Sequence, residues 1–227
     1  MAKNTEDVTW MERSTEKSDV PDLERLAGLG EIWVRQRRKV TQEFLNYAPM
    51  GKFWVENPEG HKILDVKESE DEAEKLYCQK DRGFVLRGTD EVDREVLQIR
   101  RPFKTRAAVF GQLSDSTGWE VQKGSWFHKK FAVSDQDGDV KFFIKGPLFE
   151  QSIWTEDIEF KIFDGQNENF RIGGIVRKYT NLKQELFTTA HDFVLKCPAE
   201  LAVSDKALLL GALFLVNYIC YEKYGGR

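Results

Sequence analysis

The feature that most constrains this chain is an apolar segment close to its C-terminus. Residues 207–220 carry no charged side chain, Ser204 and Asp205 precede them as suitable helix caps, and Gly225-Gly226 follows as a stop signal. The pattern predicts a helix that is apolar on all sides, and such a helix has to be covered. It is shorter than the roughly 20 apolar residues that cross a bilayer. This favours burial in a protein core, and insertion into a membrane is the alternative.

The chain upstream breaks into short runs of β-branched and aromatic residues separated by turn residues. This pattern predicts an antiparallel β-sheet. The predicted strands cover residues 31–34, 40–46, 52–56, 62–67, 83–88, 95–100, 107–112, 120–123, 130–134, 140–144, 158–163 and 170–177. Hairpins are expected at 57–60, 135–138 and 164–165, where Pro or Gly stands at positions that a tight turn requires. Many short strands favour a closed or nearly closed sheet, because closure removes exposed edges.

The chain of 227 residues is long enough for one large β-domain. Residues 1–20 are polar and aperiodic, which predicts a flexible N-terminal tail, and residues 21–227 are expected to form the domain. The N-terminus resembles neither a signal peptide nor a transit peptide, so a cytoplasmic location is expected. The acidic run at 68–80 is interpreted as a solvated insertion.

Charge and reactive residues exclude several classes of function. A formal net charge of −4 argues against a surface built to bind polyanions, so no nucleic-acid partner is expected. The four cations within residues 35–39 either attract phosphate groups or form a solvated hairpin connection, and the second interpretation is favoured. The three histidines are far apart and no nucleophile motif is present. The sequence therefore predicts a protein that is not an enzyme.

Several segments, in order, resemble the phospholipid scramblase family. They are residues 21–24, 95–97, 101–102, 144–147, 157–162, 172–179 and 185–193, followed by the apolar segment near the C-terminus. The resemblance covers about residues 21–224. It implies a mainly β fold of tubby-like architecture, in which a twelve-stranded antiparallel barrel surrounds a hydrophobic C-terminal helix. That architecture agrees with the strands and the helix inferred from the residue patterns.

The resemblance also implies an activity, which is calcium-dependent, ATP-independent movement of phospholipids between membrane leaflets. The expected partner is an anionic phospholipid membrane surface, and a protein partner is left open. The cysteine-rich run that is palmitoylated in many family members is replaced here by residues 104–108. Without acyl anchors, firm membrane residence loses one of the two signals it normally needs. The alternative is a soluble tubby-like module that binds a phosphoinositide, an acyl chain or a protein without moving lipid.

The expected site residues lie near the C-terminus. Arg177, Lys178 and Lys183 are the candidates for binding a lipid headgroup, with solvated surface charge as the alternative. Headgroup binding implies that the protein is peripheral at a membrane. The alternative is single-pass insertion by the 205–222 helix.

The family's calcium segment corresponds here to residues 189–200. Asp192 and Glu200 are its hard oxygen donors, and His191 stands where the family has an aspartate. Calcium requires six to eight oxygen ligands, so calcium binding is expected to be weak or absent.

Overall fold

The computed structural model describes residues 9–12, 20–37, 51–68, 84–101, 108–113, 118–125, 130–147, 157–178 and 192–221. Within these ranges the chain forms twelve strands, a 3-10 helix and an α-helix. The strands are β1 (Glu31–Arg37), β2 (Lys52–Glu56), β3 (Lys62–Glu68), β4 (Phe84–Thr89), β5 (Glu95–Arg101), β6 (Ala108–Leu113), β7 (Gly118–Ser125), β8 (Lys130–Ser134), β9 (Val140–Lys145), β10 (Ile158–Asp164), β11 (Arg171–Lys178) and β12 (Asp192–Lys196). The helices are η2 (Pro21–Leu26) and α4 (Val203–Cys220).

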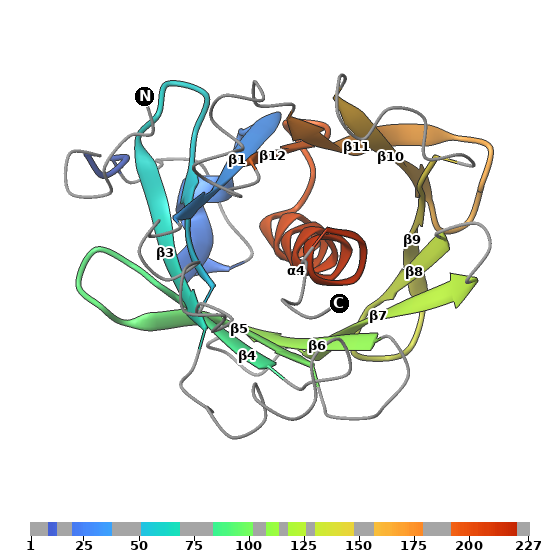
Figure 1. Ribbon diagram of the computed structural model, residues 1–227, viewed down its shortest axis with the longest axis horizontal. Coiled ribbons are helices and arrows are strands. Elements are labelled where there is room, and N and C mark those ends of the chain that lie inside the picture. The colour runs from blue at the N-terminus through green and yellow to red at the C-terminus, as the bar shows by residue number, and fades with distance from the viewer. Residues whose placement is uncertain are drawn as a thin grey trace, which may run out of the picture.

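The strands form a closed barrel in which each strand pairs with its neighbours in the chain (Figure 1). Closure comes from β1, which pairs with β2 on one side and with β12 on the other. All the strand pairs are antiparallel. A closed sheet satisfies the backbone hydrogen bonds of its strands without an exposed edge. The predicted mainly β fold with a C-terminal apolar helix is confirmed.

Side chains alternate between the inside and the outside of the barrel, as the two-residue period of a strand requires. On β10, Phe160 and Ile162 are fully buried, whereas Lys161 between them is exposed. On β1, Ile32 and Val34 are buried in the same core. The inward side chains therefore form a continuous apolar lining, and the outward side chains carry most of the charge.

The helix α4 lies inside the barrel (Figure 1). Of its 18 residues, 78% are buried. Phe214 meets Phe53 of β2 edge to face at 5.2 Å, and Tyr218 stacks on Phe84 of β4 at 4.1 Å between ring centroids. Burying one such side chain stabilises a fold by about 1.5–3 kcal/mol. The apolar segment that dominates the sequence is thus the core of the domain.

Each end of α4 also makes polar contacts with the rest of the domain. The Lys206 ammonium is fully buried and donates to the carbonyl oxygens of Leu26, at 3.0 Å, and Ala199, at 2.7 Å. Toward the other end, the Tyr218 hydroxyl donates to Glu68 Oε2 at 3.2 Å. These contacts offset the cost of removing polar groups from water. Glu68 is the buried last residue of β3, so the solvated insertion predicted for residues 68–80 does not include it.

The N-terminal segment 9–12 lies against the start of β3. Trp10 forms a parallel bridge with Lys62, and Met11 N–H donates to the Lys62 carbonyl at 2.7 Å. The Lys62 ammonium lies 4.2 Å from the centroid of a Trp10 ring. A bulky indole and two backbone hydrogen bonds hold this segment. Most of the flexible tail predicted at residues 1–20 lies outside the described residues, so it stays a prediction.

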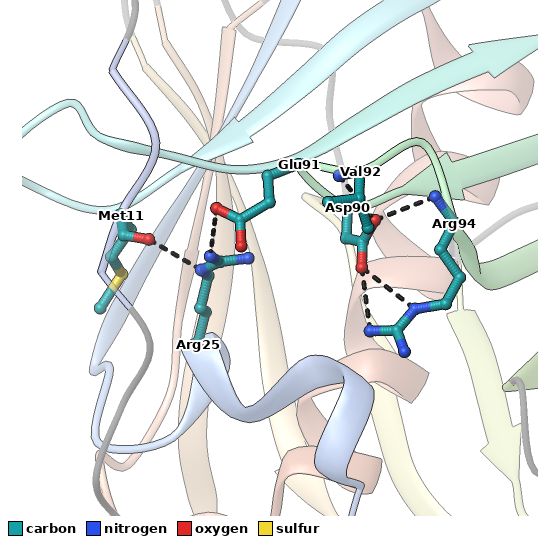
Figure 2. A network of polar contacts seen from close by, with 6 residues as sticks. All are labelled: Met11, Arg25, Asp90, Glu91, Val92 and Arg94. Carbon is teal, nitrogen blue, oxygen red and sulfur yellow. Dashed lines mark hydrogen bonds and ion pairs between the residues drawn. The ribbon is translucent and has the colours of Figure 1, made fainter.

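Arg25 of η2 links this segment to the turn between β4 and β5 (Figure 2). Its guanidinium donates to the Met11 carbonyl at 2.7 Å and pairs with Glu91 at 2.7 Å. In the same turn, Asp90 accepts hydrogen bonds from the guanidinium of Arg94 at 3.0 and 3.1 Å. Burial raises the pKa of Asp90, but the hydrogen bonds outweigh it and the pKa is lowered.

The hairpin predicted at residues 135–138 is confirmed. Asp135 Oδ1 accepts the backbone N–H groups of Asp137 and Asp139, each at 3.0 Å. Gly138 has a φ of 86°, a conformation that glycine adopts without strain. The Asp135 carboxylate therefore closes this turn.

The sequence does not predict β12. The family resemblance makes residues 189–200 a calcium segment, but Asp192–Lys196 within them is a strand between β1 and β11. Phe193, Val194 and Leu195 are buried, and such a short apolar run fits a strand covered on both faces. The strand predicted at 40–46 lies outside the described residues.

Candidate functional site

One expected headgroup residue and one expected calcium residue meet where β11 ends and β12 begins. Lys178 is in register with Asp192, and Arg177 is in register with Phe193. Antiparallel pairing therefore places a predicted headgroup ligand beside a predicted calcium ligand. Lys183 and His191 lie outside the described residues.

Arg177 points into the barrel rather than toward its outer surface. Its side chain is buried, and its guanidinium carbon lies 4.7 Å from the ring centroid of Tyr221, the residue that follows α4. A cation at this position is favoured by the aromatic ring and by the negative end of the helix dipole. In this arrangement Arg177 fixes the end of α4, and Arg177 and Lys178 face opposite sides of the sheet.

Lys178 lies on the outer face. Its ammonium forms an ion pair with Asp157 at 2.7 Å and lies 5.9 Å from the centroid of a Trp33 ring. The Lys178 side chain is 34% exposed. Lys178 is thus accessible to an external anion, which would have to compete with Asp157.

Arg35 of β1 joins two carboxylates from neighbouring strands. Its Nε pairs with Glu56 Oε1 at 2.8 Å, and its Nη1 pairs with Asp192 Oδ2 at 2.6 Å. Its guanidinium carbon also lies 4.3 Å from the centroid of a Trp33 ring. The second oxygen of the buried Glu56 accepts a hydrogen bond from Trp54 Nε1 at 3.0 Å. We call Trp33, Arg35, Trp54, Glu56 and Asp192 the Arg35 cluster.

Burial and charge act together on this cluster. Burial raises the pKa of Asp192, and the attraction of Arg35 opposes this increase only in part. Burial lowers the pKa of Arg35, but Asp192 and Glu56 outweigh it and the pKa of Arg35 is raised. Asp192 therefore takes up a proton more readily than an exposed aspartate and is engaged by a firmly protonated arginine. Both effects weaken Asp192 as a ligand for a cation.

The two carboxylates expected to bind calcium are not brought together. Asp192 begins β12, whereas Glu200 is exposed in the turn beyond the far end of that strand. A strand of this length spans about 13 Å at its usual rise per residue. In the part of the chain that the structure describes, no group of three or more His, Cys, Asp or Glu residues is arranged to hold a metal ion. Calcium binding therefore stays a prediction that needs donors from elsewhere.

The comparisons with known proteins identify the family. A family model described as Scramblase matches residues 11–223. The chain belongs to the scramblase family. The resemblance found in the sequence is thus confirmed, and the match begins ten residues earlier than the segments that suggested it. No solved structure matches the chain significantly.

Curated scramblases match over nearly the whole chain. Phospholipid scramblase 2 of Bos taurus is 25% identical over 217 residues, which cover 91% of this chain and 73% of the relative. Phospholipid scramblase 1 of Rattus norvegicus is 25% identical, and the match covers 96% of this chain and 68% of the relative. Phospholipid scramblase family member 5 of Homo sapiens is 26% identical, with 89% and 78% covered. These relatives are named for an action on phospholipids.

Sequence reasoning missed most of the Arg35 cluster in this scramblase-family chain. The charge pattern favours a solvated hairpin connection at residues 35–39, but Arg35 lies within β1 and pairs with two carboxylates. The two-residue period of β1 does place Trp33 and Arg35 on one face. The acidic partners are 21 and 157 residues away in the sequence, however, so only the barrel register brings them to Arg35.

Among the described residues of this scramblase-family chain, one helix, α4, is long and apolar enough to cross a membrane, judged by length and composition. The same helix is the buried core of the barrel, which is the arrangement expected of a core helix in a globular domain. Membrane insertion would require α4 to leave the barrel and expose the core side chains that now pack around it.

Proposed function

We propose that this chain moves phospholipids between the leaflets of a membrane without nucleotide hydrolysis. The observation that carries the proposal is the scramblase family match across residues 11–223, together with relatives named phospholipid scramblases. Such movement requires no covalent step, so a non-enzymatic mechanism fits a site made of ion pairs and aromatic rings. The protein acts from the cytoplasm as a peripheral component at an anionic membrane surface.

Calcium enters the proposal as a testable stimulus, with Asp192, Glu200 and His191 as its expected ligands. Arg35 must release Asp192 before that carboxylate binds a cation with both oxygens. The proposed affinity for calcium is therefore low.

A second candidate is a lipid-binding module that moves no lipid. The specific observation in its favour is the position of α4, whose apolar surface is already covered by the barrel. Such a module binds a headgroup, an acyl chain or a protein through its outer surface. The two candidates differ in whether a bilayer becomes permeable to phospholipid headgroups.

A flip measurement separates the two candidates. Purified protein is reconstituted into vesicles that contain a fluorescent phospholipid, and the fraction reached by a membrane-impermeant quencher is followed with calcium or with a chelator. Scrambling predicts exchange faster than in protein-free vesicles. Stimulation of exchange by calcium is expected to disappear in Asp192→Asn and Glu200→Ala. Vesicle binding without exchange at any calcium concentration contradicts scrambling and supports the binding module.

The position of α4 during this activity is measured at Cys220. This thiol is partly exposed near the end of the helix, whereas Cys197 is buried and burial raises its pKa to about 11. In a Cys78→Ser background, thiol labelling therefore reports mainly on Cys220. Labelling that is unchanged by vesicles means that α4 stays in the barrel. Labelling that changes only with vesicles means that α4 moves.

A further inference from the structure

Three lysines form a row on the outer face of the barrel, away from the Arg35 cluster. Lys130 of β8 is in register with Lys145 of β9, and Lys145 is in register with Lys161 of β10. We call these residues the lysine row. Neighbouring strands lie about 4.8 Å apart, and like charges directly opposite each other destabilise a sheet. The row extends over three successive strands and therefore concentrates positive charge on the outer face of β8–β10.

Aromatic rings support two of the three ammonium groups. Lys130 Nζ lies 4.5 Å from the ring centroid of Phe143 on the next strand, and Lys145 Nζ lies 4.6 Å from that of Phe163. Phe143 and Phe163 are themselves in register. The same lysine-on-phenylalanine contact is therefore repeated on successive strands. It holds the charges at the outer surface while the rings cover the lysine stems.

An internal carboxylate already occupies this positive surface. Glu168 lies in the hairpin between β10 and β11. Both of its carboxylate oxygens accept hydrogen bonds from Lys130 Nζ at 2.9 Å, and one of them pairs with Lys145 Nζ at 3.0 Å. Hydrogen bonds from Lys130 and then Lys145 lower the pKa of Glu168. No ion pair joins Lys161 to any residue in the described ranges. Lys130 and Lys145 thus already bind one anion, and Lys161 adds a third cation to the row.

The hairpin that carries Glu168 also presents an exposed aromatic side chain. Phe170 is 62% exposed, one of two large hydrophobic side chains exposed to this degree among the described residues. The hairpin contacts the row directly, because Lys145 Nζ lies 3.3 Å from the Glu168 carbonyl oxygen. Cations beside an exposed aromatic ring suit the boundary between lipid headgroups and acyl chains, where the ring enters the apolar layer and the lysines meet phosphates.

We propose that the lysine row and Phe170 form a contact surface for an anionic phospholipid membrane. Lipid phosphate and carboxylate groups bind Lys130, Lys145 and Lys161 and displace the Glu168 carboxylate, while Phe170 enters the interfacial layer. Lysine suits this role because its ammonium is a compact charge that binds phosphates in many orientations. The inference rests on the proposed action on phospholipids and locates the membrane contact on β8–β10, away from Arg177 and Lys178.

The test measures partitioning of the full chain onto vesicles by sedimentation, with a chelator present and at about 0.1 M salt. One set of vesicles is phosphatidylcholine alone, and the other contains phosphatidylserine as one quarter of the lipid. Binding is expected only to the second set. The double variant Lys130→Gln/Lys145→Gln is expected to lower the partition coefficient about 30-fold, from roughly fivefold per lysine near an anionic surface. Phe170→Ser is expected to lower it as well.

Two further variants protect the result against misfolding and against simple loss of charge. Glu168→Gln removes the competing carboxylate and is expected to raise binding about fivefold, which a folding defect would not produce. Lys52→Gln/Lys67→Gln removes the same charge from an exposed cross-strand pair on β2 and β3, on the other side of the barrel (Figure 1). This control is expected to change binding less than about twofold, because it lies beyond the screening length.

Distinct outcomes overturn the proposal. Equal vesicle binding by the lysine-row variant and its control excludes the row as a membrane contact surface. Loss of binding in the lysine-row variant, with no effect of Phe170→Ser and full competition by soluble glycerophosphoserine, indicates a site for soluble anions instead of a membrane. This assay contains no calcium and measures no exchange of lipid. Its result is therefore independent of the flip measurement. Scrambling without a role for the row contradicts only this inference, and row-dependent binding without exchange contradicts only scrambling.

Discussion

The Arg35 cluster and the lysine row are two outer faces of one barrel with opposite charge arrangements. In the first, Arg35 stands between Glu56 and Asp192, so each charge faces an opposite one across the strands. In the second, Lys130 and Lys145 face each other and share Glu168, which comes from a hairpin rather than from a neighbouring strand.

The cross-strand partner therefore determines the role of a surface cation. The Glu56 side chain is 2% exposed, so Arg35 is required to keep a buried carboxylate paired. Glu168 is 39% exposed, and an exposed ion pair contributes little to stability. The first face therefore supports the fold, and the second keeps its charge available.

The largest expected effect concerns β11, the strand that lies between the two faces. A Cβ at Gly173 would lie 2.1 Å from the backbone oxygen of Lys196, whereas a Cβ at Gly174 would meet the flexible side chain of Glu159. Gly173→Ala is expected to destabilise the fold by about 3 kcal/mol, because two strand backbones must separate. Gly174→Ala is expected to cost less than about 1 kcal/mol, since one side chain has to move. Urea unfolding measures both, and equal losses would contradict a tightly held strand.

The next effect tests the structural role of the Arg35 cluster. Arg35→Met keeps an apolar stem over Trp33 but leaves the buried Glu56 without its cation. The expected loss is about 2 kcal/mol in the free energy of unfolding, the usual cost of an unpaired buried polar group. Adding Glu56→Gln to this variant should recover part of the loss.

The matched control on the other face is Lys130→Gln/Lys145→Gln. It should change stability by less than about 0.5 kcal/mol, because the pairs are exposed and cross-strand repulsion is relieved. A loss as large as that of Arg35→Met would remove the distinction between a supporting face and an available one.

The smallest expected effect is on the titration of two acidic groups. Burial raises the pKa of Asp192 above its ordinary value of 3.8, whereas hydrogen bonds from Lys130 and Lys145 lower the pKa of Glu168 below 4.5. The contribution of Glu168 to stability is therefore present above its ordinary pKa and lost as the pH falls through the lowered value. Asp192 acts in the opposite direction, because its ionisation as the pH rises disfavours the folded state.

Carboxyl carbon chemical shifts followed by NMR against pH measure both groups. The Asp192 midpoint is expected above 3.8 and the Glu168 midpoint below 4.5, with Glu168 returning toward its ordinary value in Lys130→Gln/Lys145→Gln. Equal directions of shift in the two groups would show that burial does not distinguish the faces.

Much of the fold could be predicted from local patterns. The alternation in β10 and the Asp135 turn each depend on residues close together in the sequence, and both agree with the structure. The strand β12 was missed because five residues with three consecutive apolar side chains show no alternation. Of the expected site, Lys178 and Asp192 prove to be neighbours, whereas Arg177 faces the core and Glu200 lies past the far end of β12.

Residue patterns alone are enough to predict that this chain is mainly β, that its apolar segment near the C-terminus must be covered, and that it resembles scramblases. Those properties follow from periodicity, turn chemistry and ordered motifs, which are local. Only the tertiary structure decided that Arg35 meets Asp192, that Arg177 points inward, and that Lys130, Lys145 and Lys161 form a row. Barrel register sets these relations, and a shift of one residue would turn every side chain to the opposite face.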